Sequence, residues 1–117
     1  MASERMRRVD EAVRAVLADA IPRILKDPRV GFVTITDVNT SPDLRQAQVH
    51  VSVLGDPDAQ AAALAGLNSA HGVLQREVGS QLHMKRTPAL TFRLDETAAR
   101  AARLEALIDR LSPETDA

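Results

Sequence analysis

The sequence predicts a small α+β domain in which helices pack on one face of a three-stranded mixed sheet. The 117 residues are 44% apolar and include no cysteine, so a single core without disulfides is expected. Three segments alternate apolar and polar residues with the period of a strand, and the other segments repeat apolar residues at helical spacing. The connection from the second strand to the third is long enough to cross over, which makes the sheet mixed.

The first predicted helix covers the N-terminal segment. Apolar residues recur at steps of three and four between Met6 and Ile24, and Ser3 is a candidate N-cap. Pro22 lacks the N–H that an internal helix position needs, so we expect a kink or an early end near Ile21. The first residues form no apolar block that could act as a signal peptide, and no stretch is long enough for a membrane span, which favours a cytoplasmic location.

Two strands follow a helix stop at the Asp-Pro pair 27–28. Residues 30–38 are rich in Val, Ile, Thr and Phe, while residues 45–54 place Ala47 and three valines on one side of a strand and polar residues on the other. Turn-forming residues occupy 39–43. We expect an antiparallel hairpin whose valine face lies under the helices and whose polar face contacts water.

The next segment predicts two helices with a break between them. Asp56 and Pro57 suit the N-cap and the first position of an alanine-rich helix. A second apolar helical face begins shortly after it. We therefore expect a helix–kink–helix at Ala70-His71-Gly72, where glycine interrupts the helical pattern.

A third strand and a last helix complete the predicted domain. Residues 89–94 alternate apolar and polar side chains, and the final helix has one apolar stripe that ends at Leu111. The polar segment 113–117 is expected to be a disordered tail. Because no linker divides the chain, we expect residues 1–112 to form a single domain.

The sequence offers no arrangement of residues for catalysis. There is no cysteine, and His50, His71 and His83 lack the spacing of metal ligands on one helix. No nucleophile-and-base set can be assembled, and the Gly-rich phosphate-binding patterns are missing from the sequence. We therefore expect no enzyme activity, no metal, no cofactor and no small-molecule substrate.

Charge is distributed unevenly along the chain, although the net charge is only -1. Residues 71–93 have a net charge of +3 and residues 94–117 a net charge of -3. The charged residues of the first segment are Arg76, Lys85, Arg86, Arg93 and Glu77. Such a basic cluster can bind phosphate while the whole protein stays near neutral; taken alone, it is more simply a solvated helix face. With aromatic residues at 2%, base stacking is not expected.

A second basic cluster lies near the N-terminus. Arg5, Arg7 and Arg8 are close in sequence, and Arg29 joins them if the first helix ends beside the hairpin. Acidic residues within one helical turn can pair with these arginines and reduce their attraction for a polyanion.

The predicted kink is the most informative feature for function. A small residue and a glycine at a bend let another backbone approach closely, and the second helix presents its N-terminal N–H groups there to an anion. KH RNA-binding domains clamp a nucleotide backbone with a GXXG loop at this place, whereas this chain has the break without that loop. The simpler alternative is that Gly72 only permits two helices to pack tightly.

Several segments together resemble the bacterial ribosome-binding factor A family. Residues 27–38, 41–44 and 47–54 are similar to the hairpin of that family, and residues 82–92 to its signature before and within the third strand. Ala70-His71-Gly72 matches the Ala-x-Gly kink that replaces GXXG in the family. The resemblance covers about residues 4–111 in the same order, and the combination is more specific than any one motif.

The resemblance implies a type II KH-like fold and a cytoplasmic, monomeric assembly factor that binds the immature small ribosomal subunit and its ribosomal RNA. It also implies support for late maturation of that RNA, including processing at its 5′ end, with the greatest importance in the cold. We expect RNA contacts at the kink, on the helix after it and in the basic clusters. The candidate residues are Ala70, His71, Gly72, Arg76, Lys85, Arg86, Arg29 and Arg8.

One departure from the family pattern affects this expectation. Where the family often has Phe-Leu-Arg after the kink glycine, this chain has Val73-Leu74-Gln75. One arginine of the RNA contact is therefore missing, and Arg76 replaces it only in part because it points elsewhere on the helix.

An alternative function does not involve RNA. The same α+β layering suits a protein-interaction or dimerising regulatory module that uses the alanine-rich helix as its contact. A stable homodimer without ribosomal association would favour that alternative.

Overall fold

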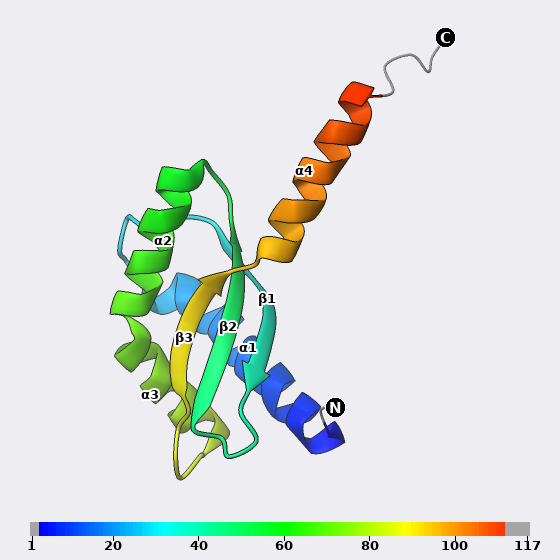
Figure 1. Cartoon of the computed structure of the whole chain (residues 1–117). Helices are drawn as coiled ribbons and strands as arrows, with labels where there is room; N and C mark the ends of the chain where they lie inside the picture. The colour runs from blue at the N-terminus through cyan, green and yellow to red at the C-terminus, as the bar shows by residue number, and fades with distance from the viewer. Residues whose placement is uncertain (1–2, 112–117) are drawn as a thin grey trace.

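The computed structural model describes residues 3–111, apart from the side chains of Ala98, Ala99 and Ala102. Four helices and three strands follow one another in the predicted order (Figure 1). Their bounds are α1 Glu4–Ile24, β1 Val33–Thr40, β2 Gln46–Val53, α2 Pro57–Ser69, α3 His71–Leu82, β3 Ala89–Leu94 and α4 Glu96–Leu111. The predicted tail 113–117 lies outside the described residues.

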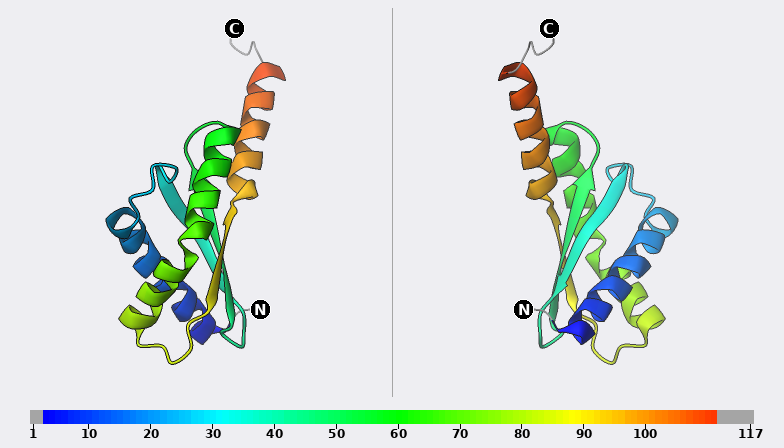
Figure 2. Two further views of the ribbon diagram at one scale, coloured as in Figure 1. Left: turned by 90° about the vertical axis from the view of Figure 1, so that its left-hand side faces the viewer. Right: turned by 90° about the vertical axis from the view of Figure 1, so that its right-hand side faces the viewer.

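The three strands form one mixed sheet in the order β1-β2-β3. β1 and β2 are antiparallel, whereas β2 and β3 are parallel, as the long crossover through α2 and α3 requires. Helices α1, α2 and α3 lie on the same face of the sheet (Figure 2). The predicted α+β class and mixed sheet are confirmed.

Helix α4 departs from the prediction that the helices pack on one face of the sheet. It leaves the end of β3 and extends away from the other elements (Figure 1). Its large apolar side chains are exposed, with Leu104 at 57% and Leu111 at 72%. Within the described residues, no helix is both long and apolar enough to cross a membrane.

Helix α1 begins as predicted, but it does not end early. The Ser3 hydroxyl accepts a hydrogen bond from the backbone N–H of Met6 at 3.1 Å and caps the first turn. The helix continues through Pro22 to Ile24, and the N–H of Leu25 still bonds the Ile21 carbonyl at 3.0 Å. The expectation of an end near Ile21 was wrong because the last turn is held by burial of Ile21 and by packing of Ile24 against the core.

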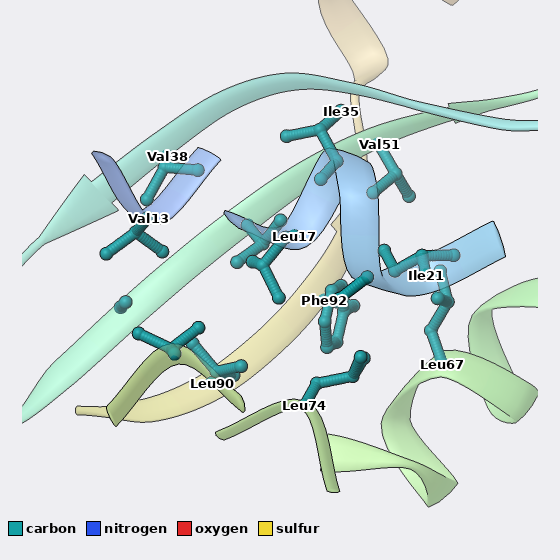
Figure 3. Packing of buried hydrophobic residues seen from close by; sticks show 14 of the residues in the cluster. Val13, Leu17, Ile21, Ile35, Val38, Val51, Leu67, Leu74, Leu90 and Phe92 are labelled. Carbon is teal, nitrogen blue, oxygen red and sulfur yellow. The ribbon is translucent and has the colours of Figure 1, made fainter. Parts of the chain in front are cut away.

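The core lies between the sheet and the three packed helices (Figure 3). Phe92 at its centre is 1% exposed, and Ala47, Val49, Val51 and Val53 of β2 all face inward as their alternation predicts. Strand β1 contains an irregularity that the alternation did not predict. Its register shifts between Ile35 and Asp37, so Ile35 and Val38 both reach the core although they are three residues apart.

The break between α2 and α3 is where the sequence placed it. Asp56 caps α2 by accepting from the N–H of Ala59 at 2.8 Å, with Pro57 in the first turn. Ala70 is both the C-cap of α2 and the N-cap of α3, with φ -94° and ψ 10°. One residue therefore joins the two helices, and the predicted helix–kink–helix is confirmed.

Candidate nucleic-acid interface

The kink presents the start of α3 without a side-chain cap. The N–H of Ala70 bonds the carbonyls of Gly66 at 3.2 Å and Leu67 at 3.0 Å, which completes α2. Ala70 then accepts from the N–H of Leu74 at 3.1 Å, which begins α3. No side chain caps α3, so its first-turn N–H groups and the positive end of its dipole are available to an anion.

His71 is oriented by the helix before it. Its Nδ1 lies 2.8 Å from the carbonyl oxygen of Asn68. Because a carbonyl oxygen only accepts, Nδ1 must carry the proton of this hydrogen bond. The other ring nitrogen, Nε2, is left to interact with a ligand at the exposed side of the kink.

Gly72 faces open space. A Cβ added there would meet no atom within 4 Å outside its own neighbourhood. The alternative that Gly72 exists to let two helices pack tightly is therefore wrong. The close approach occurs one turn before the kink, at Gly66, where an added Cβ would lie 2.7 Å from Cγ2 of Val30.

Arg29 lies near the kink, but its charge is balanced. The segment containing it packs on α2, because a Cβ on Gly66 would lie 3.6 Å from Cβ of Arg29. Its guanidinium pairs with Asp27 at 2.7 Å, and the hydrogen bond lowers the pKa of the Asp27 carboxyl below its usual range. Arg29 thus lies near the kink, where the Asp27 carboxylate balances its charge.

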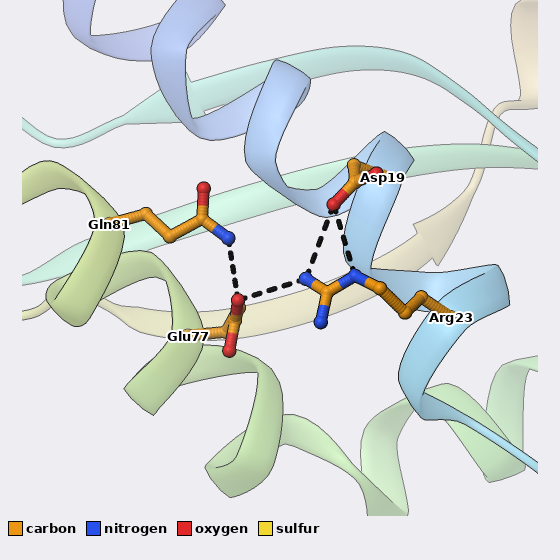
Figure 4. Close-up of polar contacts among 4 residues, drawn as sticks. All are labelled: Asp19, Arg23, Glu77 and Gln81. Atoms are coloured by element: carbon orange, nitrogen blue, oxygen red, sulfur yellow. Dashed lines mark hydrogen bonds and ion pairs between the residues drawn. The ribbon is translucent and has the colours of Figure 1, made fainter.

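Arg76 lies on the outer face of α3, one turn after Gly72 and on the same side of the helix. It is exposed and has no ion-pair partner within residues 3–111. The adjacent acidic residue, Glu77, points toward α1 and pairs with Arg23 at 2.9 Å (Figure 4). The charge of Arg76 is therefore not cancelled by its sequence neighbour.

The network around Glu77 fixes α3 against α1. Arg23 bonds both Asp19 and Glu77, and Gln81 donates a further hydrogen bond to Glu77 (Figure 4). The hydrogen bond from Gln81 and then that from Arg23 lower the pKa of Glu77. This arrangement keeps the one acidic residue of segment 71–93 on the side of α3 away from Arg76.

Two side-chain amides join the kink to the edge of β3, a role that sequence reasoning missed. Asn68 of α2 accepts from the N–H of Phe92 at 3.0 Å and donates to its carbonyl at 3.3 Å. Gln75 of α3 accepts from the N–H of Leu90 at 3.3 Å. Gln75 thus bonds a strand edge. An asparagine and a glutamine on either side of a helix break, next to an edge strand, are the only sequence signal for this role.

Lys85 and Arg86 lie at the other end of α3. His83 ends the helix in the left-handed conformation, at φ 53° and ψ 44°, and Pro88 is fully buried where β3 begins. Both basic side chains are exposed between these two points. The 12 residues of α3 separate them from the kink by about 18 Å at 1.5 Å per residue.

Arg8 is also distant from the kink. It lies near the start of α1, two residues before Asp10, which accepts from the N–H of Thr40 at the end of β1 at 2.9 Å. The structure therefore divides the candidate residues into two groups. Ala70, His71, Gly72, Arg76 and Arg29 lie at or near the kink, whereas Lys85, Arg86 and Arg8 lie toward the opposite end of α3.

The described residues contain no group of three or more His, Cys, Asp or Glu side chains that could hold a metal ion. A groove of about 400 Å³ lies between α1 and β1, and its lining is mainly apolar. Its lining includes Ile21, Phe32 and Ile35.

Comparisons with known proteins point to one family. A family model described as ribosome-binding factor A matches residues 5–108. A ribosome-binding factor A from Acidothermus cellulolyticus is 46% identical over 106 residues, which cover 91% of this chain and 71% of that protein.

A solution structure and a fitted homology model share the fold. The solution structure of a putative ribosome binding factor A from Thermotoga maritima matches with a TM-score of 0.71 and 28% identity over 80% of this chain and 89% of that one. A homology model of Thermus thermophilus ribosome binding factor A, fitted into the cryo-EM map of a 30S complex, matches with a TM-score of 0.60 and 24% identity. That match covers 80% of this chain and 93% of the other.

Proposed function

The chain belongs to the ribosome-binding factor A family, and from this premise we propose that it binds the immature small ribosomal subunit and contacts its ribosomal RNA. Its fold is KH-like. The proposed role is support for late maturation of that RNA, including 5′-end processing, with the greatest need in the cold. We further propose that it acts in the cytoplasm as a monomer without catalysis. The 30S complex described for the Thermus thermophilus relative supports the choice of partner.

The observation that carries the RNA contact is the pairing of Gly72 and Arg76 on one open face of α3. An RNA backbone can approach the uncapped helix start over Gly72, because no side chain fills the space there. Arg76, one turn further on and without a carboxylate partner within residues 3–111, then meets a neighbouring phosphate. His71 Nε2 supplies one more polar group at the same place.

Recognition is expected to depend on RNA shape and backbone and not on base sequence. The chain has two aromatic residues; Phe92 is buried in the core, whereas Phe32 is 81% exposed beside the groove between α1 and β1. One exposed aromatic side chain does not make a platform on which successive bases stack. Phosphate contacts position a protein without reading sequence.

The proposal is tested by following the protein on sucrose gradients with precursor small subunits. Replacing Lys85 and Arg86 together by Glu should weaken co-sedimentation without unfolding the domain, since both side chains are exposed. The matched control replaces Arg103 and Arg110, two exposed arginines of α4, by Glu. Equal co-sedimentation of the Lys85/Arg86 variant and the wild type would refute the role of these residues, and no association of the wild type would refute the partner.

A second candidate function remains a protein-interaction or dimerising module. The observation that favours it is the apolar side of α4, where Leu107 is 47% and Ile108 51% exposed. These exposures favour a contact on α4 over one on the alanine-rich α2, whose Ala63 and Leu67 are buried in the core. A concentration-dependent mass in light scattering, with no association with ribosomal particles, would favour this alternative.

A further inference from the structure

Three segments that are distant in sequence meet at one end of the fold. The N–H of Ala89 bonds the carbonyl of Arg45 at 2.9 Å, which places the turn between β1 and β2 beside the connector that carries Lys85 and Arg86. The bond from the N–H of Thr40 to Asp10 brings the first turns of α1 to the same hairpin end. Figures 1 and 2 show the start of α1, this turn and the α3–β3 connector at the same end of the molecule.

This end of the fold, formed by residues 4–10, 41–45 and 83–88, is termed the basic end. Its basic residues are Arg5, Arg7, Arg8, Arg45, Lys85 and Arg86, and its acidic residues are Glu4, Asp10 and Asp43. Each acidic side chain is engaged locally, because Glu4 pairs with Arg7, Asp10 accepts from Thr40, and Asp43 holds the turn. Within residues 3–111, Arg5, Arg8, Lys85 and Arg86 have no ion-pair partner.

The turn presents Arg45 in a fixed position. The Asp43 carboxylate accepts from the Ser41 hydroxyl at 2.7 Å and from the N–H of Arg45 at 3.0 Å. The Arg45 carbonyl is held by β3, so both sides of its backbone are bonded. The Arg45 side chain itself is 67% exposed and lies 3.9 Å from Asp43, the longest of the ion-pair distances in the described part of the chain. A fixed backbone with an exposed guanidinium suits a phosphate contact.

We propose that the basic end is a second phosphate-binding surface for RNA, separate from the kink, and that Arg45 is a binding residue at its centre. This inference rests on the proposed function, because it takes RNA as the partner. It adds to the sequence-predicted residues one arginine that lies 40 positions before Lys85 in the chain. The two surfaces lie at opposite ends of α3, about 18 Å apart along its axis, so one protein contacts separate phosphates at each end.

RNA fits this end better than an acidic protein does. Protein interfaces have an apolar, often aromatic, centre. The large exposed apolar residues of the described chain are Phe32, Leu54, Val73 and four residues of α4, and none belongs to the basic end. Phosphates need only charge and hydrogen-bond donors, which Arg45, Lys85 and Arg86 supply.

The test compares Arg45→Gln with the wild type in binding a labelled RNA duplex and precursor small subunits over a range of salt. Loss of one phosphate contact should make the log–log salt slope shallower by about 0.7 to 0.9 and weaken binding several-fold at low salt. Arg45→Lys should retain most of the slope. Arg103→Gln, with the same charge change on α4, is the control and should change neither quantity.

The outcomes separate this inference from the proposed function. If the wild type binds precursor subunits and Arg45→Gln binds them and the duplex with an unchanged slope, the second surface is refuted while the proposed function stands. If the wild type does not associate with subunits, the proposed function fails, and the duplex alone decides whether the basic end binds RNA phosphates. An effect of Arg45→Gln on capture of an acidic protein but not of RNA would also overturn the proposal. When Arg45→Gln is combined with Arg76→Gln, their effects on RNA binding should add, because the two sites are far apart.

Discussion

The side chain of Asn68 bonds both backbone groups of Phe92, accepting from its N–H at 3.0 Å and donating to its carbonyl at 3.3 Å. Asn68 lies in the last turn of α2, two residues before the kink residue Ala70. Phe92 is the largest fully buried side chain of the core. This pair therefore connects the candidate RNA-binding kink directly to the centre of the fold, and the backbone carbonyl of Asn68 also orients His71.

Replacing Asn68 by Ala should destabilise the protein. Both polar groups of Phe92 at the edge of β3 would lose their partner in a partly buried site, which costs about 1 to 3 kcal/mol. Urea unfolding measures this change in the free energy of unfolding. Asn39→Ala, which removes only an exposed hydrogen bond to Asp37, is the control and should stay within about 0.5 kcal/mol of the wild type.

Replacing Gln75 by Arg should lower the stability of the protein and raise its affinity for RNA. Arginine cannot accept a hydrogen bond, so the N–H of Leu90 loses the Gln75 carbonyl oxygen and the free energy of unfolding falls by about 1 kcal/mol. The added positive charge beside Arg76 should steepen the salt slope of RNA binding by about 0.7 to 0.9. Gln75→Glu keeps an acceptor and should preserve more stability while weakening RNA binding; a Gln75→Arg variant as stable as the wild type would show that the bond contributes little.

Two glycine-to-alanine substitutions near the kink should differ in their effect on the stability of the protein. Gly72→Ala meets no neighbouring atom, so the protein should be as stable as the wild type or more stable by up to about 1 kcal/mol, while RNA binding weakens because the open approach is narrowed. Gly66→Ala brings its Cβ to 2.7 Å from Val30 and should destabilise the fold by about 1 to 3 kcal/mol. Thermal unfolding and RNA titration of both variants separate the two roles, and unchanged RNA binding by Gly72→Ala would exclude a backbone approach at this glycine.

The network at Glu77 should make part of the stability depend on pH. The pKa of Glu77 is lowered from 4.5 in the folded protein, first by the hydrogen bond from Gln81 and then by that from Arg23. A carboxyl whose pKa is lowered by folding stabilises the protein when the pH is above its pKa in the unfolded state. This contribution is lost as the pH falls through its pKa in the folded state. The difference in stability between the wild type and Glu77→Gln should therefore be largest at neutral pH and shrink in acid below 4.5. If this difference in stability is constant with pH, the ionised carboxylate of Glu77 is not what stabilises the protein.

The sequence predicted the helices and strands well because the residues that begin, end and pattern them are neighbours in the chain. The Ser3 and Asp56 caps depend on residues three positions away, and the alternation in β2 depends on the period of a strand. The kink at Ala70 was predicted for the same reason, since glycine weakens a helix wherever the helix lies. The end of α1 beyond Pro22 and the irregularity of β1 were not predicted correctly, because packing of α1 and the register with β2 decide them.

The sequence by itself determined that this chain forms an α+β fold with a kink between α2 and α3, and that its basic residues concentrate before α4. Only the tertiary structure decided how those residues are grouped. In the folded protein Asp27 balances the charge of Arg29, and Glu77 points away from Arg76. Gln75 bonds the edge of β3. Arg45 lies beside the connector that carries Lys85 and Arg86. The physical reason is that charge pairing and hydrogen bonding act over a few ångströms in space, and packing of the helices on the sheet sets which residues come that close.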